Sequence, residues 1–258
     1  MHKIFDTHAH YDDHAFDSDR DKVLCDLLCN NVCCIVNQGT DIPTSQYSLQ
    51  LAEKYDGIYA AVGLHPEYLN ENSPKLIPQI RELAAHPKAV AIGEIGLDYY
   101  YDIPQELQKR IFAQQLELAN ELSLPVVVHD REAHGDVVRL LRQYHPQGIV
   151  HCFSGSAETA KEIIKLGMYI GMGGVVTFKN ARKTVEVIKA IPLEYLVLET
   201  DCPYLSPVPF RGKRNDSSMI KYIAAKIAEI KNTTVDEILN VTKENAERVY
   251  HIEVSEVN

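Results

Sequence analysis

The sequence predicts a (β/α)8 barrel with an extra C-terminal helix, in one domain that spans residues 1–258. The chain has 258 residues, of which 45% are hydrophobic and 24% charged, as expected for one large α/β domain. Eight short apolar or β-branched runs alternate with stretches suited to helices. Polar side chains follow most of these runs, which is where (β/α)8 barrels carry their active groups.

Eight strands are expected at the short apolar or β-branched runs. Each run is too short for a typical helix and is bounded by polar or turn-forming residues. The runs cover residues 4–7, 33–37, 58–62, 89–94, 125–129, 148–151, 168–172 and 195–199.

Helices are expected between and after these runs. They cover residues 17–31, 43–55, 73–86, 104–122, 133–145, 156–166, 180–190, 216–230 and 234–249. Asp236 and Glu237 near the start of the last stretch, and Lys243 and Arg248 near its end, suit the helix dipole. Eight strand-then-helix units match the count of a barrel, and a doubly wound open sheet is the alternative with the same alternation.

Composition and charge exclude several classes of protein. The apolar runs fall far short of the roughly 18 to 20 residues that span a bilayer, and the N-terminal residues lack the apolar segment of a secretory signal. We therefore expect a cytoplasmic protein that makes no membrane contact. The 26 basic and 36 acidic residues give a net charge of −10, which disfavours a broad basic face for nucleic acid.

The cysteines are expected to be structural. Cys25, Cys29 and Cys33 recur every four residues, which on a helix predicts small buried side chains along one face. Cys152 follows His151 directly, and adjacent residues of a strand point to opposite faces, so its thiol is expected to point away from any site that contains the imidazole.

Titratable side chains follow six of the eight expected strands. His8 and His10 are two residues apart, so on a strand they point the same way, about 6.6 Å apart. The others each follow an apolar run, where a titratable group is unfavourable unless it is paired or bound to a metal. The sequence therefore predicts a metal site from His8, His10, Glu94, His129, His151 and Asp201.

Four histidines and two carboxylates exceed the usual ligand set of one small divalent ion. Two ions fit the set better, with one carboxylate bridging them at about 3.5 to 4 Å. Imidazole suits zinc and similar metals, whereas carboxylates admit magnesium or manganese. The pattern therefore predicts two divalent ions and leaves Mg, Mn and Zn as the candidates.

Seven motifs, in order along the chain, resemble the TatD family of metal-dependent hydrolases in the amidohydrolase superfamily. They are FDTHAHYD at 5–12, VGLHP at 62–66, AIGEIGLDYY at 91–100, PVVVHDRE at 125–132, HCFSG at 151–155, ETDCPYL at 199–205 and PFRGKRN at 209–215. The resemblance covers essentially the whole chain and implies a (β/α)8 barrel with deoxyribonuclease activity. It places His8, His10, Glu94 and Asp201 on one ion, and Glu94, His129 and His151 on a second.

The resemblance implies hydrolysis of phosphodiester bonds in DNA, of the 3′–5′ exonuclease type, by a metal-activated water. Glu94 and Asp201 would be the catalytic carboxylates, with Asp201 accepting the proton of the water. We expect a monomer that contacts DNA transiently through phosphates. The candidate substrate contacts are His65, Arg131, Arg211, Lys213 and Arg214.

Two other classes of function stay open. One is a metallohydrolase that acts on a small amide, ester or lactone such as a D-aminoacyl ester. The other is a barrel that binds a metal or a partner without catalysis. The individual contacts have alternatives of their own. Segment 211–214 could be a solvated charged loop, and His65 and Arg131 could pack beside the site without contacting substrate.

Overall fold

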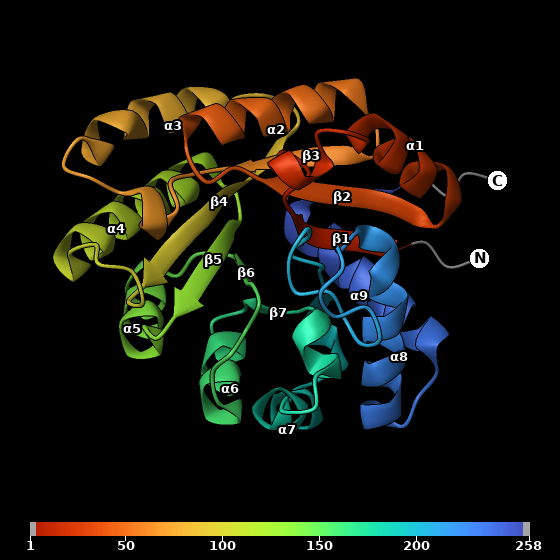
Figure 1. Cartoon of the computed structure of the whole chain (residues 1–258). Helices are drawn as coiled ribbons and strands as arrows, with labels where there is room; N and C mark the ends of the chain where they lie inside the picture. Colours follow the sequence, from red (N-terminus) through yellow and green to blue (C-terminus); the bar gives the residue numbers. More distant parts are fainter. Residues whose placement is uncertain (1–3, 255–258) are drawn as a thin grey trace.

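Eight parallel strands form one ring in chain order, β1 to β8, with helices on the outside (Figure 1). This computed structural model describes residues 4–254, so the ends of the predicted domain, 1–3 and 255–258, lie outside the described residues. The sequential strand order confirms the barrel, because a doubly wound sheet reverses its order. The strands are β1 (Ile4–Ala9), β2 (Val32–Gln38), β3 (Ile58–Val62), β4 (Ala89–Asp98), β5 (Val126–Arg131), β6 (Gly148–Val150), β7 (Tyr169–Met172) and β8 (Leu196–Leu198).

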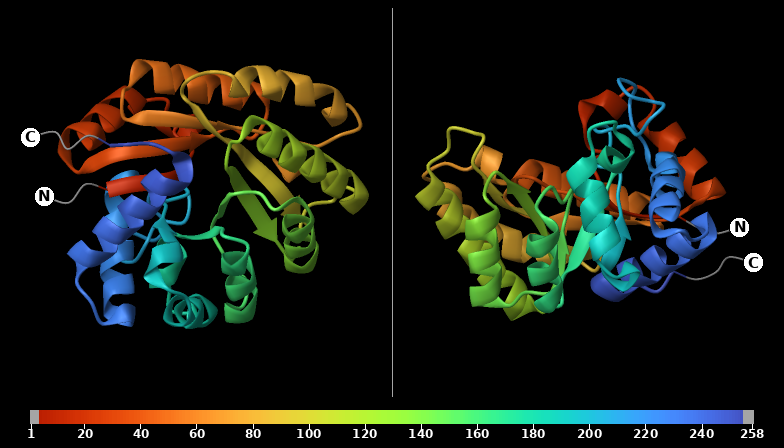
Figure 2. Two further views of the ribbon diagram at one scale, coloured as in Figure 1. Left: turned by 180° about the vertical axis from the view of Figure 1, so that it is seen from behind. Right: turned by 90° about the horizontal axis from the view of Figure 1, so that it is seen from below.

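The helices surround the ring, as the views from behind and below also show (Figure 2). They are α1 (Arg20–Asn30), α2 (Ile42–Lys54), α3 (Ile77–Ala84), α4 (Gln105–Leu122), α5 (His134–Tyr144), α6 (Ala157–Lys165), α7 (Arg182–Ala190), α8 (Ile220–Lys231) and α9 (Val235–Tyr250). Side-chain oxygens of Asp41, Ser156 and Thr234 accept backbone N–H groups at the starts of α2, α6 and α9. Between residues 4 and 254, no helix is both long and apolar enough to cross a membrane.

Short 3-10 turns complete the connections. They are η1 (His14–Phe16), η2 (Pro66–Tyr68), η3 (Ser73–Leu76), η4 (Gly174–Thr177), η5 (Leu193–Tyr195) and η6 (Ser217–Met219). Two expected helices, 73–86 and 216–230, begin as such turns, η3 and η6, before α3 and α8 continue them.

The predicted C-terminal helix, α9, closes the N-terminal end of the barrel. Its residues Ala246, Val249 and Tyr250 pack in one cluster with Phe5 and Val197 from the interior of the strands. The Tyr250 hydroxyl also donates to the Thr7 carbonyl at 2.8 Å. This end of the barrel is therefore filled and apolar, which leaves the opposite end for polar groups.

The ring closes between β8 and β1 through a single bridge. Ala9 pairs with Cys202, which lies beyond the end of β8. The His10 N–H donates to the Cys202 carbonyl at 2.8 Å, and the Asp201 N–H donates to the His8 carbonyl at 2.9 Å. The seam is thus fastened at the C-terminal edge of the sheet.

The cysteines near the N-terminus differ from the expectation. Cys25 and Cys29 are exposed, because Leu24 and Leu27 occupy the buried face of α1. The helix ends at Asn30, so Cys33 belongs to β2 instead of continuing the helical row.

Candidate metal centre

A cavity of about 930 Å³ lies among the residues that follow the strands, at the C-terminal end of the barrel. Its walls combine imidazoles, carboxylates and tyrosines. The sequence-predicted residues that line it are His10, His65, Glu94, His129, Arg131, His151 and Asp201. His8 is fully buried directly beneath.

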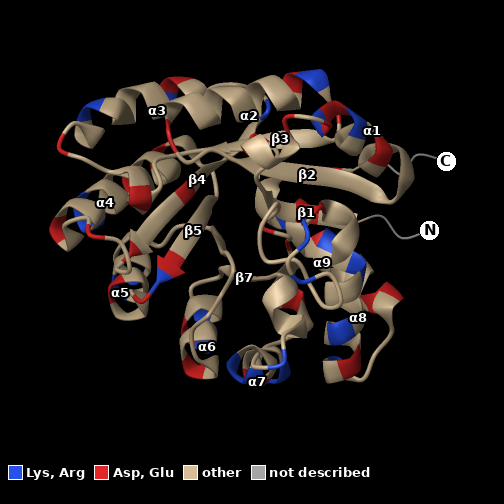
Figure 3. Ribbon diagram, in the orientation of Figure 1, with Lys and Arg blue, Asp and Glu red and all other residues tan. Residues whose placement is uncertain are grey.

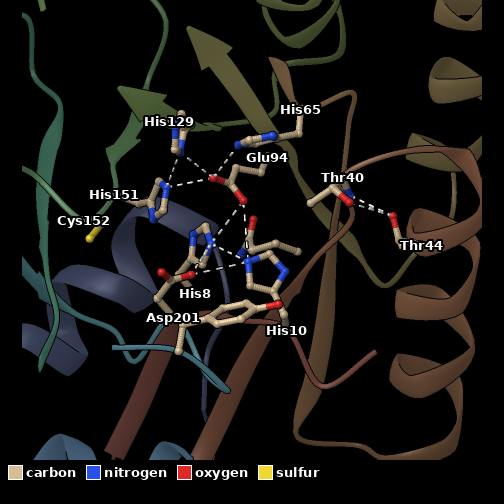
Figure 4. A network of polar contacts seen from close by, with 12 residues as sticks. His8, His10, Thr40, Thr44, His65, Glu94, His129, His151, Cys152 and Asp201 are labelled. Atoms are coloured by element: carbon tan, nitrogen blue, oxygen red, sulfur yellow. Dashed lines mark hydrogen bonds and ion pairs between the residues drawn. The ribbon is translucent and has the colours of Figure 1, made fainter. Parts of the chain in front are cut away.

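A first cluster of donor atoms forms where β1, β4 and the segment after β8 meet (Figure 4). The His8 and His10 Nε2 atoms lie 3.1 Å apart, and they lie 3.4 and 3.6 Å from Glu94 Oε2. The same two nitrogens lie 3.6 and 3.5 Å from Asp201 Oδ1. Tetrahedral ligands at zinc-like bond lengths are separated by about 3.3 Å, so these four donors suit one small divalent ion.

A second cluster forms around the other oxygen of Glu94. Its Oε1 lies 2.8 Å from His151 Nε2 and 3.1 Å from His129 Nδ1, and these two nitrogens are 3.3 Å apart. The two oxygens of Glu94 therefore face different groups of donors. A carboxylate that bridges two ions requires this division.

His65 approaches the second cluster in a different role. Its Nε2 lies 3.4 Å from Glu94 Oε1, while its Nδ1 accepts the Glu67 N–H at 3.2 Å. A neutral imidazole that accepts at Nδ1 carries its proton on Nε2. His65 thus presents an N–H donor to the cavity, which suits a substrate contact. With Glu94 and His129 it also forms a group of side chains close enough together to hold a metal ion.

Asp98 is a site residue that sequence reasoning missed. Its Oδ2 lies 2.8 Å from His129 Nε2, and its Oδ1 accepts the Tyr100 N–H at 2.9 Å. The carboxylate fixes the ring so that Nδ1 faces Glu94, as acidic partners of metal-binding histidines commonly do. The available signal was that Asp98 lies four residues after Glu94, a spacing that places two side chains on the same face of a strand. The signal was missed because the strand was predicted to end at residue 94.

Asp6 fixes the segment that contains Asp201. Its Oδ1 accepts the Thr200 N–H at 3.0 Å, and its Oδ2 accepts the hydroxyls of Thr200 and Ser217 at 2.6 and 2.7 Å. This buried carboxyl ties β1 to the segment after β8 and to η6. Sequence reasoning missed this role as well, because its partners are distant along the chain.

The electrostatic environment keeps the two central carboxylates ionised. Burial alone would raise the pKa of Glu94, but the imidazoles of His151, His65 and His8 lower it well below its usual range. Burial would likewise raise the pKa of Asp201, and the hydrogen bond from His10 together with nearby imidazoles lowers it. Two anionic carboxylates among imidazoles form a donor set ready for cations.

The imidazoles differ in their protonation. Burial and the neighbouring His151 lower the pKa of His8 to about 3, so its ring is neutral. Burial would also lower the pKa of His10 and His129. Carboxylate partners outweigh it and raise both pKa values to about 9: Asp201 and Glu94 for His10, and Asp98 and Glu94 for His129. Metal binding therefore has to displace protons from this centre.

The predicted cations occupy two different places. Arg131 lines the cavity, and its guanidinium stacks 3.7 Å from the centroid of the Tyr100 ring. Among the described residues, no other lysine or arginine lines the cavity. Lysines and arginines elsewhere are interspersed with acidic residues on the outer helices (Figure 3).

The loop with Arg211, Lys213 and Arg214 lies outside the cavity lining. Arg214 forms two hydrogen bonds with the Asp19 carboxylate, at 2.8 and 2.7 Å, and Arg211 stacks 3.8 Å from the centroid of the Phe178 ring. These two guanidinium groups are engaged by the protein itself, so a phosphate-binding role for the loop stays a prediction.

Cys152 differs from the expectation. It lines the cavity beside His151, because β6 already ends at Val150 and Cys152 has a left-handed backbone with φ 43°. Alternation along a strand no longer applies there. Burial raises the pKa of the thiol well above its usual range, so Cys152 is a neutral wall residue and not a thiolate nucleophile.

Comparisons with known proteins agree on one family. Residues 5–251 match the family described as TatD related DNase. An uncharacterized metal-dependent hydrolase of Bacillus subtilis, YabD, is 47% identical over 253 residues, which cover 96% of this chain and 99% of that protein. The 3′–5′ ssDNA/RNA exonuclease TatD of Klebsiella pneumoniae is 33% identical, covering 98% and 100%. The crystal structure of YJJV, a TatD homologue from Escherichia coli, gives a TM-score of 0.90 at 34% identity, covering 97% and 98%.

Proposed function

The chain belongs to the TatD-related DNase family of metal-dependent hydrolases, and we propose that it removes nucleotides from the 3′ end of single-stranded DNA with two divalent ions. The observation that carries the proposal is the division of Glu94. One oxygen faces His8 and His10, and the other faces His129 and His151. Such a pair of sites suits the two-ion hydrolysis of a phosphodiester.

Each residue of the centre has a task in this reaction. Bound divalent ions supply a water of lowered pKa and offset the charge of the phosphodiester. Glu94 would hold both ions, and Asp98 orients His129 beside it. Asp201 is ionised, lines the cavity and keeps 18% of its side chain exposed, so it can take a proton from a water in the cavity.

The rest of the cavity supports a strand end as the substrate. The His65 Nε2–H and the Arg131 guanidinium are donors for one phosphate. Tyr68 and Tyr204 line the cavity with about half of each residue exposed, at 54% and 53%, and offer ring faces to unpaired bases. Acidic lining residues repel additional phosphates, which disfavours a long duplex. They are Asp12, Asp13, Glu67, Asp98 and Asp130.

The same acidic lining favours one alternative. A small amide, ester or lactone, such as a D-aminoacyl ester, needs no phosphate contact, and a substrate with a free amine would be attracted by these carboxylates. This alternative uses the same ions and the same Asp201, and it differs only in what fills the outer cavity.

An assay of the chelator-stripped protein distinguishes the two substrates. Single- and double-stranded DNA, labelled at either end, and a panel of small esters are incubated with Mg²⁺, Mn²⁺ or Zn²⁺ restored one at a time. We expect stepwise shortening of single strands from the 3′ end, and no activity in Glu94→Gln. Hydrolysis of the esters without cleavage of DNA under any metal would contradict the proposal and establish the alternative.

A further inference from the structure

Three buried polar atoms without hydrogen-bond partners among the described residues gather beneath the metal centre. They are His8 Nδ1, His151 Nδ1 and Glu199 Oε2. All three side chains are almost completely buried. A buried polar atom is unfavourable unless it finds a partner, so a group of three in one place calls for a function.

The imidazoles of His8 and His151 have the same orientation, with Nε2 toward Glu94 and Nδ1 away from it. The rings stack with centroids 3.8 Å apart and planes within 9°. One donor atom from each imidazole and one oxygen of Glu199 lie within 4.8 Å of one another, and His151 Nδ1 is 3.9 Å from Glu199 Oε1.

The position of the Glu199 carboxyl is built into the fold. The Cys152 N–H donates to Oε1 at 2.5 Å. Gly171 of β7 provides the space for the other oxygen, because a Cβ at this position would overlap Oε2. The side chain is fully buried directly after β8, and its carboxyl forms one close group with the imidazoles of His8 and His151.

We propose that Glu199 is a positioning residue that accepts the Nδ1–H of both His8 and His151, and so connects the two ion sites. An imidazole that gives Nε2 to a metal carries its proton on Nδ1, and this proton needs an acceptor that also fixes the ring. The Glu199 carboxylate would thus orient His8 for the first ion and His151 for the second. The inference rests on the proposed two-ion site, and it adds that the affinities of the two ions depend on the same residue.

Metal titration of the chelator-stripped protein, without any substrate, tests this connection. Calorimetry with Mn²⁺ or Zn²⁺ resolves the affinity of each ion. We expect Glu199→Gln to weaken both ions about 10- to 100-fold, the usual effect of losing an outer hydrogen-bond partner. Asp98→Asn is the matched control. Of the six predicted ligands, His129 is the one that the Asp98 side chain contacts among the described residues, so this change should weaken one ion alone. Glu186→Gln, on the surface of α7, should change neither.

Gly171→Ala provides a second variant that keeps the carboxylate but displaces it. It should also weaken both ions. Wild-type affinities in Glu199→Gln, or a loss confined to one ion in both variants, would overturn the inference.

NMR of the zinc-loaded wild-type protein requires no variant, so it decides the matter even if a substituted protein fails to fold. Two slowly exchanging imidazole N–H protons, assigned to His8 and His151 Nδ1, are expected, and rapid exchange of either would refute the shared acceptor. Binding of a single ion by the wild-type protein would instead contradict the two-ion site of the proposed function, and the inference with it.

Discussion

At the scale of single residues, the two central carboxylates differ in their surroundings and therefore in their tasks. Glu94 is 3% exposed and both of its oxygens are surrounded by imidazoles, so it has no oxygen left for a reacting water. The Asp201 carboxylate pairs with His8 and His10 of the first cluster and remains open to the cavity. In the proposed reaction, the proton acceptor is thus a different residue from the bridging ligand.

Replacing Asp201 with asparagine should separate metal binding from proton transfer. The amide oxygen can still face His8 and His10, but an amide does not accept a proton at neutral pH. We expect Asp201→Asn to retain much of its bound metal and to lose kcat by about 100-fold or more. Elemental analysis and single-turnover cleavage of labelled DNA measure the two quantities, and a wild-type rate would show that another group is the base.

Replacing Arg131 with alanine should weaken substrate binding. Among the described residues, no lysine or arginine other than Arg131 lines the cavity, and its guanidinium can make a charged hydrogen bond to phosphate. Because the variant loses this bond, KM for single-stranded DNA should rise about tenfold, with metal content unchanged. Arg182→Ala, on the exposed surface of α7, is the matched control. Equal KM values for both variants would remove Arg131 from the substrate site.

The loop arginines test a separate point. Arg211 and Arg214 lie outside the cavity lining, so replacing both should matter only for oligonucleotides that extend beyond the cavity. The signature is a flatter dependence of KM on salt, by about 0.7 per lost phosphate contact. An unchanged salt slope would make segment 211–214 a structural loop.

At the scale of elements, β4 determines where Glu94 points. Its pairing with β5 shifts register between Ile92 and Ile95, and the Glu94 N–H donates to the Gly39 carbonyl at 2.8 Å. A bulge of this kind redirects side chains near active sites. Gly96 follows with φ 147°, a backbone conformation that residues other than glycine rarely adopt.

Substituting alanine for Gly96 should therefore damage both the strand and the site. The added Cβ would overlap the His129 carbonyl oxygen, and the backbone would be strained. We expect a loss of at least about 2 kcal/mol in the free energy of unfolding, together with reduced metal content. Gly135→Ala in α5, where a Cβ meets no atom within 4 Å, is the control and should not destabilise the protein. Urea unfolding of both variants measures the difference, and equal midpoints would contradict this account.

The existence and type of the helices and strands were predicted from the sequence better than the residues at which they begin and end. Helices 104–122 and 234–249 lie within one residue of α4 and α9, because apolar periodicity and charges at the ends mark long helices well. The fourth strand was predicted to end at residue 94 but continues to Asp98. The prediction stopped early because the bulge and the two glycines, Gly93 and Gly96, interrupt the apolar pattern of the strand. The same error concealed Asp98. The orientation of Cys152 was predicted wrongly for a similar reason. Its left-handed backbone ends the alternation of side chains that a strand would impose.

At the scale of the whole molecule, the barrel brings together predicted ligands that lie nearly 200 positions apart in sequence. The six predicted ligands converge because parallel strands deliver their C-terminal ends to one edge, and this rule needs no contact information. Contacts between distant side chains are what the sequence alone could not supply. The Asp6 network, the two faces of Glu94 and the placement of Glu199 beneath two imidazoles all depend on packing across the barrel.

The seam of the barrel coincides with the first cluster. Neighbouring strands from β1 to β8 form ladders, whereas β8 and β1 meet through one bridge and a few hydrogen bonds. His8 and His10 lie on one side of this seam, and Asp201 lies on the other. An ion held by these three residues and Glu94 would fasten the ring where its backbone pairing is weakest.

Metal removal should therefore loosen the seam more than the rest of the barrel. At a free-ion concentration of 100 times Kd, binding stabilises the liganded state by about 2.7 kcal/mol, so opening of the seam should become about 100-fold more frequent on chelation. Hydrogen exchange at the amides of His10 and Asp201 measures this directly. The His151 amide, which bonds to Val128 within the β5–β6 pairing, is the internal reference and should change far less. His8→Ala should reproduce the effect of chelation at the seam even with metal present, because it removes a ligand of the first ion only. Uniform acceleration across all strands, or none at the seam, would show that ring closure does not depend on the first ion.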